Sequence, residues 1–238
     1  MNQTINTAEV EQFASQASHW WDEGGPFKPL HQMNPTRISY IKDNILHQRG
    51  QADLSGLKML DIGCGGGLLT EPLARLGADV LGVDAARPAI EVARQHAEYM
   101  RLQIKYECCA IENLPECHGK FDVITALEII EHVDNPDHFI ASCLSRLNPG
   151  GLIFFSTINK TRKSYLKAIL AAEYVLRMIP QGTHDWSKFI APSKLAAHLR
   201  QHGYTLLDSC GLLYNPISGE WRLSSDHSTN YICCAGEV

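Results

Sequence analysis

The stretch MLDIGCGGGLLTE, residues 59–71, decides the fold class that the sequence predicts. It places four glycines within five residues, directly after an apolar run typical of a β-strand and directly before a helix-like run. Glycine lets a ligand approach the backbone closely, and a helix N-terminus offers N–H groups without a partner inside the helix. The stretch therefore predicts a strand, a ligand-binding loop and a helix. The alternative is a glycine-rich turn that binds nothing.

The alternation of strand and helix continues along the chain. Apolar runs predict strands at residues 57–63, 78–84, 104–110, 121–127 and 152–158. Helical patterns predict helices at residues 68–77, 87–100 and 135–151, the last with Asn135 as its cap and Gly150 and Gly151 as its stop. Strands separated by helices need crossover connections, which predicts an α/β fold with a mostly parallel sheet.

The flanking regions complete the expected architecture. Residues 1–50 predict an N-terminal helical segment, and residues 159–190 interrupt the alternation as an inserted helical segment after the fifth strand. Two further strand-like runs lie at 204–214 and 229–236. We expect residues 1–238 to form one domain.

The composition is that of a globular protein. Of the 238 residues, 45% are hydrophobic and 20% are charged, and the net charge of -5 gives no reason to expect nucleic-acid binding. No apolar run reaches the roughly 18 residues of a membrane span, and the polar N-terminus lacks the apolar stretch of a signal peptide. The eight cysteines contain no C-x-x-C pair, so reduced thiols are expected. The sequence therefore predicts a cytoplasmic protein.

The glycine loop distinguishes between two classes of nucleotide-type ligand. In the dinucleotide pattern G-x-G-x-x-G, Gly63 and Gly65 match, but Leu68 occupies the third glycine position. The pattern that fits is an acidic residue followed by G-x-G-x-G, from Asp61 to Gly67. This disfavours an NAD-type oxidoreductase, which stays an alternative together with a non-catalytic cofactor-binding module.

A second acidic residue supports a nucleoside ligand. Asp84 ends the predicted strand 78–84 and lies 21 residues after Gly63 (84 − 63 = 21). A carboxylate there can accept hydrogen bonds from both ribose hydroxyls. With the acidic-glycine pattern, the chain resembles the class I S-adenosylmethionine-dependent methyltransferases. This resemblance implies a Rossmann-like fold, with a seven-stranded mostly parallel sheet, helices on both faces and a reversed last strand.

Longer motifs narrow the resemblance. They are HWWDEGGPFKPLHQMNPTR (19–37), EIIEHVDNP (128–136), the stretch 154–190 and GLLYNP (211–216). In these motifs the chain is similar to the ubiquinone biosynthesis O-methyltransferases over nearly its whole length. The resemblance implies S-adenosylmethionine as methyl donor, a polyprenylated catechol or phenol as substrate, and both O-methylation steps of the pathway. It leaves open contacts with other ubiquinone-pathway enzymes, and another small-molecule methyltransferase is the alternative.

The resemblance also implies a cofactor site. Its residues are Arg37, Asp61, Gly63, Gly65, Asp84, Ala110 and Leu127. Arg37 would pair with the methionine carboxylate, and Leu127 would contact the cofactor at the end of a strand. Many relatives have an acidic residue for the adenine amine where this chain has ECCAIENL (107–114). Cys109 or Ala110 would therefore meet the adenine through backbone groups.

Methyl transfer to a phenol requires a largely ionised oxygen, because the pKa of a phenol is about 10. Glu128, Glu131 and His132 follow the strand 121–127, and in a helical turn this i, i+3, i+4 spacing would put them on one side. Two carboxylates and an imidazole suit a divalent cation such as Mg²⁺ that binds both catechol oxygens. They equally suit His132 as a general base oriented by a carboxylate. The sequence leaves both the metal site and the general base open. A third alternative is a solvated acidic turn with a capping histidine and no catalytic role.

The inserted segment reverses the charge of the chain. Six basic and two acidic residues give residues 159–189 a local net charge of +4, against -5 for the whole chain. The apolar run YLKAILAAEYVLRMI (165–179) is too short to span a bilayer. We therefore expect 159–189 to lie on an anionic membrane surface, associating the protein peripherally with the inner face of the membrane. The alternative is a lid that packs over the active site.

Overall fold

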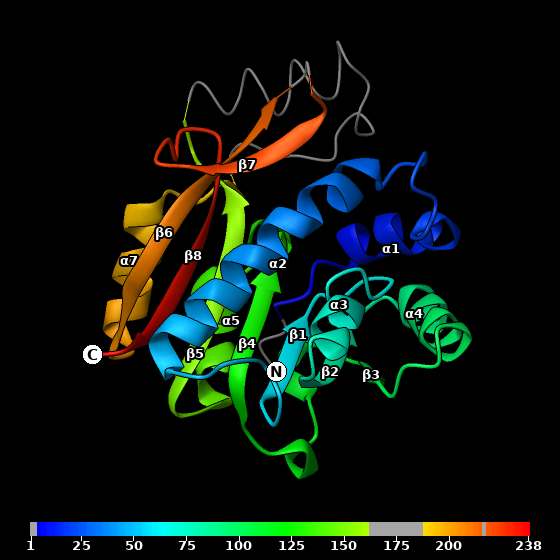
Figure 1. Cartoon of the computed structure of the whole chain (residues 1–238), viewed down its shortest axis with the longest axis horizontal. Coiled ribbons are helices and arrows are strands. Elements are labelled where there is room, and N and C mark those ends of the chain that lie inside the picture. Colours follow the sequence, from blue (N-terminus) through cyan, green and yellow to red (C-terminus); the bar gives the residue numbers. More distant parts are fainter. Residues whose placement is uncertain (1–3, 162–187, 216–217) are drawn as a thin grey trace.

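The computed structural model of the chain describes residues 4–161, 188–215 and 218–238 (Figure 1). Within these residues the strands are β1 Lys58–Ile62, β2 Asp79–Asp84, β3 Lys105–Cys108, β4 Phe121–Leu127, β5 Leu147–Ile158, β6 Tyr204–Asn215, β7 Glu220–Ser224 and β8 Asn230–Glu237. The helices are α1 Thr7–Ser15, α2 Lys28–Arg49, α3 Thr70–Arg75, α4 Arg87–Tyr99, α5 Pro136–Ser145 and α7 Pro192–Gln201. Short 3-10 turns are η1 Ala17–His19, η2 Ile111–Asn113, η3 Glu116–His118 and η4 Ile130–His132.

The described strands form one eight-stranded sheet in the order β3-β2-β1-β4-β5-β8-β6-β7. Strands β1 to β5 pair in parallel, whereas β8 runs antiparallel to both β5 and β6. The predicted α/β fold with a mostly parallel sheet and a reversed last strand is confirmed. The predicted number of seven strands was one too few, because β7 pairs with β6 as an antiparallel hairpin at the sheet edge. The short run EWRLS of β7 alternates polar and apolar residues, as a half-exposed edge strand does.

An apolar core lies on each face of the sheet. Adjacent side chains of a strand point to opposite faces. In β5, Phe155 therefore joins the buried cluster that contains residues of α5 and α7, and Phe154 joins the cluster of α2 and α3. The predicted helices on both faces are confirmed, and α1 and α2 confirm the helical segment predicted for 1–50 (Figure 1).

The helix predicted over 135–151 was wrong at its C-terminal end. Asn135 caps α5 as predicted, since its Oδ1 accepts the N–H of His138 at 3.1 Å. The helix ends at Ser145, however, and Gly150 and Gly151 lie inside β5. The register between β4 and β5 shifts in this region, and Gly150 has φ +70. This part of β5 is therefore irregular, and its sequence lacks the pattern of a regular strand. Most of the insertion predicted over 159–190 lies outside the described residues.

Candidate active site

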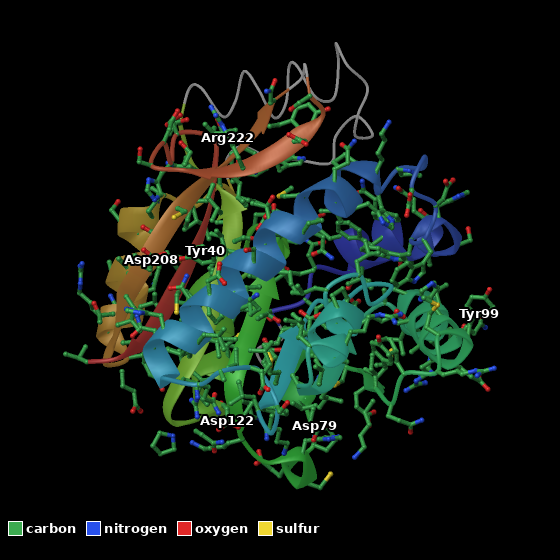
Figure 2. The ribbon with its side chains drawn as sticks, in the orientation of Figure 1. Tyr40, Asp79, Tyr99, Asp122, Asp208 and Arg222 are labelled. Carbon is green, nitrogen blue, oxygen red and sulfur yellow. The ribbon has the colours of Figure 1, made fainter. Side chains whose placement is uncertain are left out.

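A cavity of about 620 Å³ opens at the carboxyl ends of the parallel strands. Asp79 and Asp122, labelled in Figure 2, mark the opposite, amino ends of β2 and β4. In open α/β sheets ligands bind outside the carboxyl ends. All residues predicted from the sequence to bind cofactor or to act in catalysis line this cavity: Arg37, Asp61, Gly63, Gly65, Asp84, Ala110, Leu127, Glu128, Glu131 and His132. The fold therefore brings the two predicted sets together.

Asp61, near the end of β1, is buried and binds two threonine hydroxyls. Thr70 Oγ1 donates to Oδ2 at 2.6 Å, and Thr125 Oγ1 donates to Oδ1 at 2.8 Å. Burial raises the pKa of Asp61 to about 6, although both hydroxyls favour its ionised form. Because Thr70 begins α3 and Thr125 lies in β4, the Asp61 carboxylate ties the start of the glycine loop to two neighbouring elements.

Asp84, at the end of β2, holds the glycine loop from the other side. Its Oδ2 accepts the N–H of Gly65 at 2.9 Å, and its Oδ1 accepts the N–H of Ala86 at 2.8 Å. Burial raises the pKa of Asp84, and the backbone hydrogen bonds oppose that shift. An ionised carboxylate has about four acceptor positions. The two that remain match the hydroxyls of a ribose, so the geometry is compatible with the predicted role.

The glycines of the loop leave room for a neighbouring segment as well as for a ligand. Gly63 and Gly65 have φ +71 and +54, a left-handed backbone that other residues rarely adopt. A Cβ added at Gly65 would lie 2.4 Å from the ring of Trp20. Trp21 Nε1 donates to the carbonyl of Gly66 at 3.0 Å. Residue spacing did not predict this contact, for which the adjacent tryptophans of the HWWDE motif were the available signal.

Arg37 of α2 is 5% exposed and pairs with Glu128, whose Oε1 lies 2.6 Å from Arg37 Nη2. Ser156 Oγ donates to the same oxygen at 2.6 Å. Among the described residues, the buried Arg37 Nε has no hydrogen-bond acceptor. An unpaired buried donor costs about 1–3 kcal/mol. An anionic group of a ligand at this end of the cavity would accept the Nε–H hydrogen bond and so offset that cost. The methionine carboxylate predicted to pair with Arg37 is such a group.

Glu131 is held from the other face of β5. Its Oε2 accepts from Thr157 Oγ1 at 2.8 Å. Ser156 and Thr157 are adjacent in β5, so their side chains point to opposite faces and hold Glu128 and Glu131 apart. Burial raises the pKa of Glu131 above its usual range, and the Glu128 carboxylate adds to the shift. The expected helical turn with Glu128, Glu131 and His132 on one side is wrong, because Glu128 has φ +51 and the tighter turn η4 begins after it.

His132 ends η4 and contacts helix α1. Its Nδ1 lies 3.1 Å from Glu9 Oε2, and the Phe13 ring meets the imidazole edge-on at 5.2 Å between centroids. Burial lowers the pKa of His132, but the hydrogen bond with Glu9 and the charges of Glu131, Glu9 and Glu128 outweigh it, so the pKa is raised. Glu9 lies 123 residues before His132 in the chain. Glu9 was not predicted as a site residue, because no local pattern in the sequence connects it to His132.

The predicted metal ligands do not converge in this structure. In the described part of the chain, no group of three or more His, Cys, Asp or Glu side chains could hold a metal ion. Arg37 already neutralises Glu128, and Glu131 is bound from the other face of β5. Magnesium requires near-ideal octahedral oxygen ligation, which this arrangement fits poorly. The magnesium site therefore stays a prediction that chelation tests.

Comparison with known proteins shows the family. A family profile described as a methyltransferase domain matches residues 31–209. The ubiquinone biosynthesis O-methyltransferase of Cereibacter sphaeroides is 48% identical over 236 residues, covering 96% of this chain and 95% of that protein. The protein of the same name from Sinorhizobium fredii is 44% identical over 237 residues, covering 98% of this chain and 96% of that protein. The chain belongs to the ubiquinone biosynthesis O-methyltransferase family.

This member of the ubiquinone biosynthesis O-methyltransferase family shares its fold with solved methyltransferases of low sequence identity. The magnesium protoporphyrin IX methyltransferase of Synechocystis has a TM-score of 0.68 at 17% identity, covering 98% of this chain and 99% of that one. The plantazolicin methyltransferase has a TM-score of 0.66 at 16% identity, covering 97% and 96%. Both were crystallised with S-adenosylhomocysteine bound. The predicted Rossmann-like class I methyltransferase fold is confirmed.

Proposed function

We propose that this chain transfers the methyl group of S-adenosylmethionine to a phenolic oxygen of polyprenylated ubiquinone precursors, at both O-methylation steps of the pathway. The activity class follows from the family, so the chain is an S-adenosylmethionine-dependent O-methyltransferase. The proposed roles of the individual residues rest on one observation. The glycine loop, Asp84, Arg37 and His132 all line one cavity. The continuous sheet supports a single domain over residues 1–238.

The cavity residues fit a cofactor that carries a ribose and a carboxylate. Asp84 has acceptor positions left for both ribose hydroxyls, and Arg37 Nε has no other acceptor among the described residues. Ala110 and Leu127 form the part of the cavity wall that would frame the adenine and the methionine chain. When bound, S-adenosylmethionine supplies an electrophilic methyl group on its sulfonium.

His132 would take the phenolic proton as general base. The imidazole accepts this proton, and the carboxylates of Glu9, Glu131 and Glu128 stabilise the imidazolium that forms. Proton removal matters because an un-ionised phenol is a weak nucleophile. The cavity then has to hold the oxygen in line with the methyl–sulfur bond. Such positioning can contribute roughly 7–11 kcal/mol in well-oriented reactions.

The cavity walls suit an apolar substrate. Aromatic and aliphatic side chains from α1, the α2 region and the β6–β7 hairpin line it, namely Phe13, Phe27, Leu30, Met33, Leu213 and Trp221. Each buried methylene group contributes about 0.8 kcal/mol. These walls therefore favour a ring that carries a hydrocarbon tail.

Mass detection of the product tests the proposed function. The purified chain is incubated with S-adenosylmethionine and a prenylated catechol, and we expect a product that carries one added methyl group. Calorimetry should show binding of S-adenosylhomocysteine and none of NADH. Binding of NADH without methylation would favour an oxidoreductase. Binding of S-adenosylhomocysteine with no methylation of any phenol or catechol would favour a non-catalytic binding module.

We also propose peripheral association with the inner face of an anionic membrane through residues 159–189. The support is the +4 charge of that segment, from six basic and two acidic residues, beside its apolar run. Most of the segment, 162–187, lies outside the described residues. In the part that is described, no helix combines the length and apolarity needed to cross a bilayer.

Vesicle flotation tests this association. Binding should require anionic lipid and weaken with salt, because the attraction is screened. It should also fall when Arg162 and Lys163 are both replaced by Glu. Equal binding to neutral vesicles, or no binding at all, would contradict the membrane proposal and leave the methyltransferase assignment untouched.

A further inference from the structure

We propose that Glu9 is a positioning residue that fixes the ring orientation and the tautomer of His132. This inference rests on the proposed role of His132 as the base, and it adds the residue that aims the base. In a neutral imidazole one nitrogen carries a proton and the other offers a lone pair. If Nδ1 keeps its proton against Glu9, Nε2 is the nitrogen left to accept the phenolic proton.

Two contacts from one helix hold the imidazole ring. Glu9 Oε2 lies 3.1 Å from His132 Nδ1, and the ring of Phe13 lies edge-on to the imidazole at an interplanar angle of 86°. Glu9 and Phe13 are four residues apart in α1, so they lie on the same helix face. One contact defines the direction of Nδ1, and the other defines the plane of the ring.

The charge state of Glu9 decides which atom carries the shared proton. Its Oε1 lies 2.9 Å from Lys188 Nζ, so both carboxylate oxygens have a partner. The Lys188 ammonium favours the ionised form of Glu9, and the ordinary pKa of a glutamate, about 4.3, already leaves the carboxyl ionised at neutral pH. An ionised carboxylate can only accept, so the proton sits on Nδ1. The other carboxylates that face His132 are those of Glu131 and Glu128. Both accept a hydrogen bond from a hydroxyl of β5, and Glu128 also accepts one from Arg37.

Helix α1 is fixed to the chain segment that immediately follows His132. Ile5 forms a β-bridge with Val133, and the N–H of Asp134 donates to the carbonyl of Thr4 at 2.9 Å. Asn6 Nδ2 donates to Asp134 Oδ1 at 2.9 Å, and Asn6 also caps α1. The carboxylate and the imidazole are therefore carried by two segments that are bonded to each other, which keeps their separation constant.

A pair of charge-neutralising variants separates this role from a general effect of charge. Glu9→Gln keeps the side-chain size and removes the charge. Glu11→Gln removes the same charge from an exposed position of the same helix. We expect Glu9→Gln to lower kcat about 10–100-fold, which is part of what a general base contributes. The Kd for S-adenosylhomocysteine should stay within about twofold of that of the unmodified enzyme. Glu11→Gln should match the unmodified enzyme in both.

Nitrogen NMR of the histidine-labelled enzyme reads the tautomer directly. The His132 signals are assigned by their absence in His132→Gln. We expect the neutral ring to carry its proton on Nδ1 in the unmodified enzyme, and to become a mixture of tautomers in Glu9→Gln.

Two results would overturn the positioning role. The first is a neutral His132 ring with its proton on Nε2 in the unmodified enzyme, which is measured without any variant. The second is an unchanged kcat in folded Glu9→Gln. Failure of the base assignment itself would show separately, as full activity in His132→Ala, while the NMR spectrum still reports whether Glu9 sets the tautomer.

Discussion

The two sides of the cavity are held by different means. On the sheet side, Asp61 accepts hydrogen bonds from two threonine hydroxyls, and Asp84 accepts hydrogen bonds from two backbone N–H groups. On the N-terminal side, helix α1 reaches His132 through Glu9 and Phe13. The segment before α1 is bonded to Val133 and Asp134, which follow His132. The sheet thus preorganises the cofactor side, whereas the orientation of the base depends on a separate segment. Cofactor affinity and turnover should therefore respond to different substitutions.

The largest expected effect is on turnover. His132→Ala should lower kcat about 10²–10⁴-fold, the usual contribution of a general base, because the phenolic proton loses its acceptor. The Kd for S-adenosylmethionine should change little, since the proposed cofactor contacts lie at the glycine loop, Asp84 and Arg37. Steady-state kinetics and calorimetry measure the two quantities, and His47→Ala on an exposed position of α2 is the control. Unaltered turnover by the folded His132→Ala protein would exclude the base role.

The next effect is on cofactor affinity. Asp84→Asn should raise the Kd for S-adenosylmethionine about 10–100-fold, because hydrogen bonds to charged groups contribute about 1.5–3 kcal/mol. Asp79→Asn is the matched control, since Asp79 is exposed at the amino end of the same strand (Figure 2). Calorimetry that gave equal affinities for the folded Asp84→Asn and Asp79→Asn proteins would remove Asp84 from the cofactor site.

A smaller effect concerns the docking of the N-terminal segment. Trp21→Phe removes the hydrogen bond to the Gly66 carbonyl but keeps a ring against His96, on which Trp21 stacks at 3.4 Å between centroids. The free energy of unfolding should fall by about 1 kcal/mol, which lowers Tm by about 2–4 °C in a chain of this size. Thermal unfolding followed by circular dichroism measures the shift. An unchanged Tm would mean that this bond does not hold the segment.

The smallest expected effect is that of a chelator. Since Arg37 neutralises Glu128 and Glu131 is bound by Thr157, we expect activity to survive removal of divalent ions. The assay compares initial rates before and after dialysis against a chelator. A loss of activity that Mg²⁺ restores would contradict the metal-free account and support the predicted metal set.

The sheet side of the site could be predicted from the sequence because its pattern is local. Asp61 lies near the end of β1, the glycines follow that strand directly, and Asp84 ends β2. Spacing along the chain therefore translates into position at one sheet edge. Arg37 and Leu127 were found through the family resemblance, and spacing alone would not have singled them out.

The N-terminal side could not be predicted in this way. Trp21 meets Gly66 across 45 residues, and Glu9 meets His132 across 123. Such contacts depend on how a preceding segment packs, which residue spacing does not encode. The rule that i, i+3 and i+4 share a side applies only inside a helix, and it failed at Glu128 because that residue has φ +51 and precedes the turn.

The central claim is that one cavity holds the cofactor at Asp84 and Arg37 and the substrate oxygen at His132. A structure of the enzyme with S-adenosylhomocysteine and a prenylated catechol tests it most directly. We predict ribose hydroxyls on Asp84, the cofactor carboxylate on Arg37, and a catechol oxygen within about 2.6–3.2 Å of His132 Nε2, the reach of a general base. A catechol bound away from His132, or a cofactor that leaves Asp84 without a contact, would contradict the account.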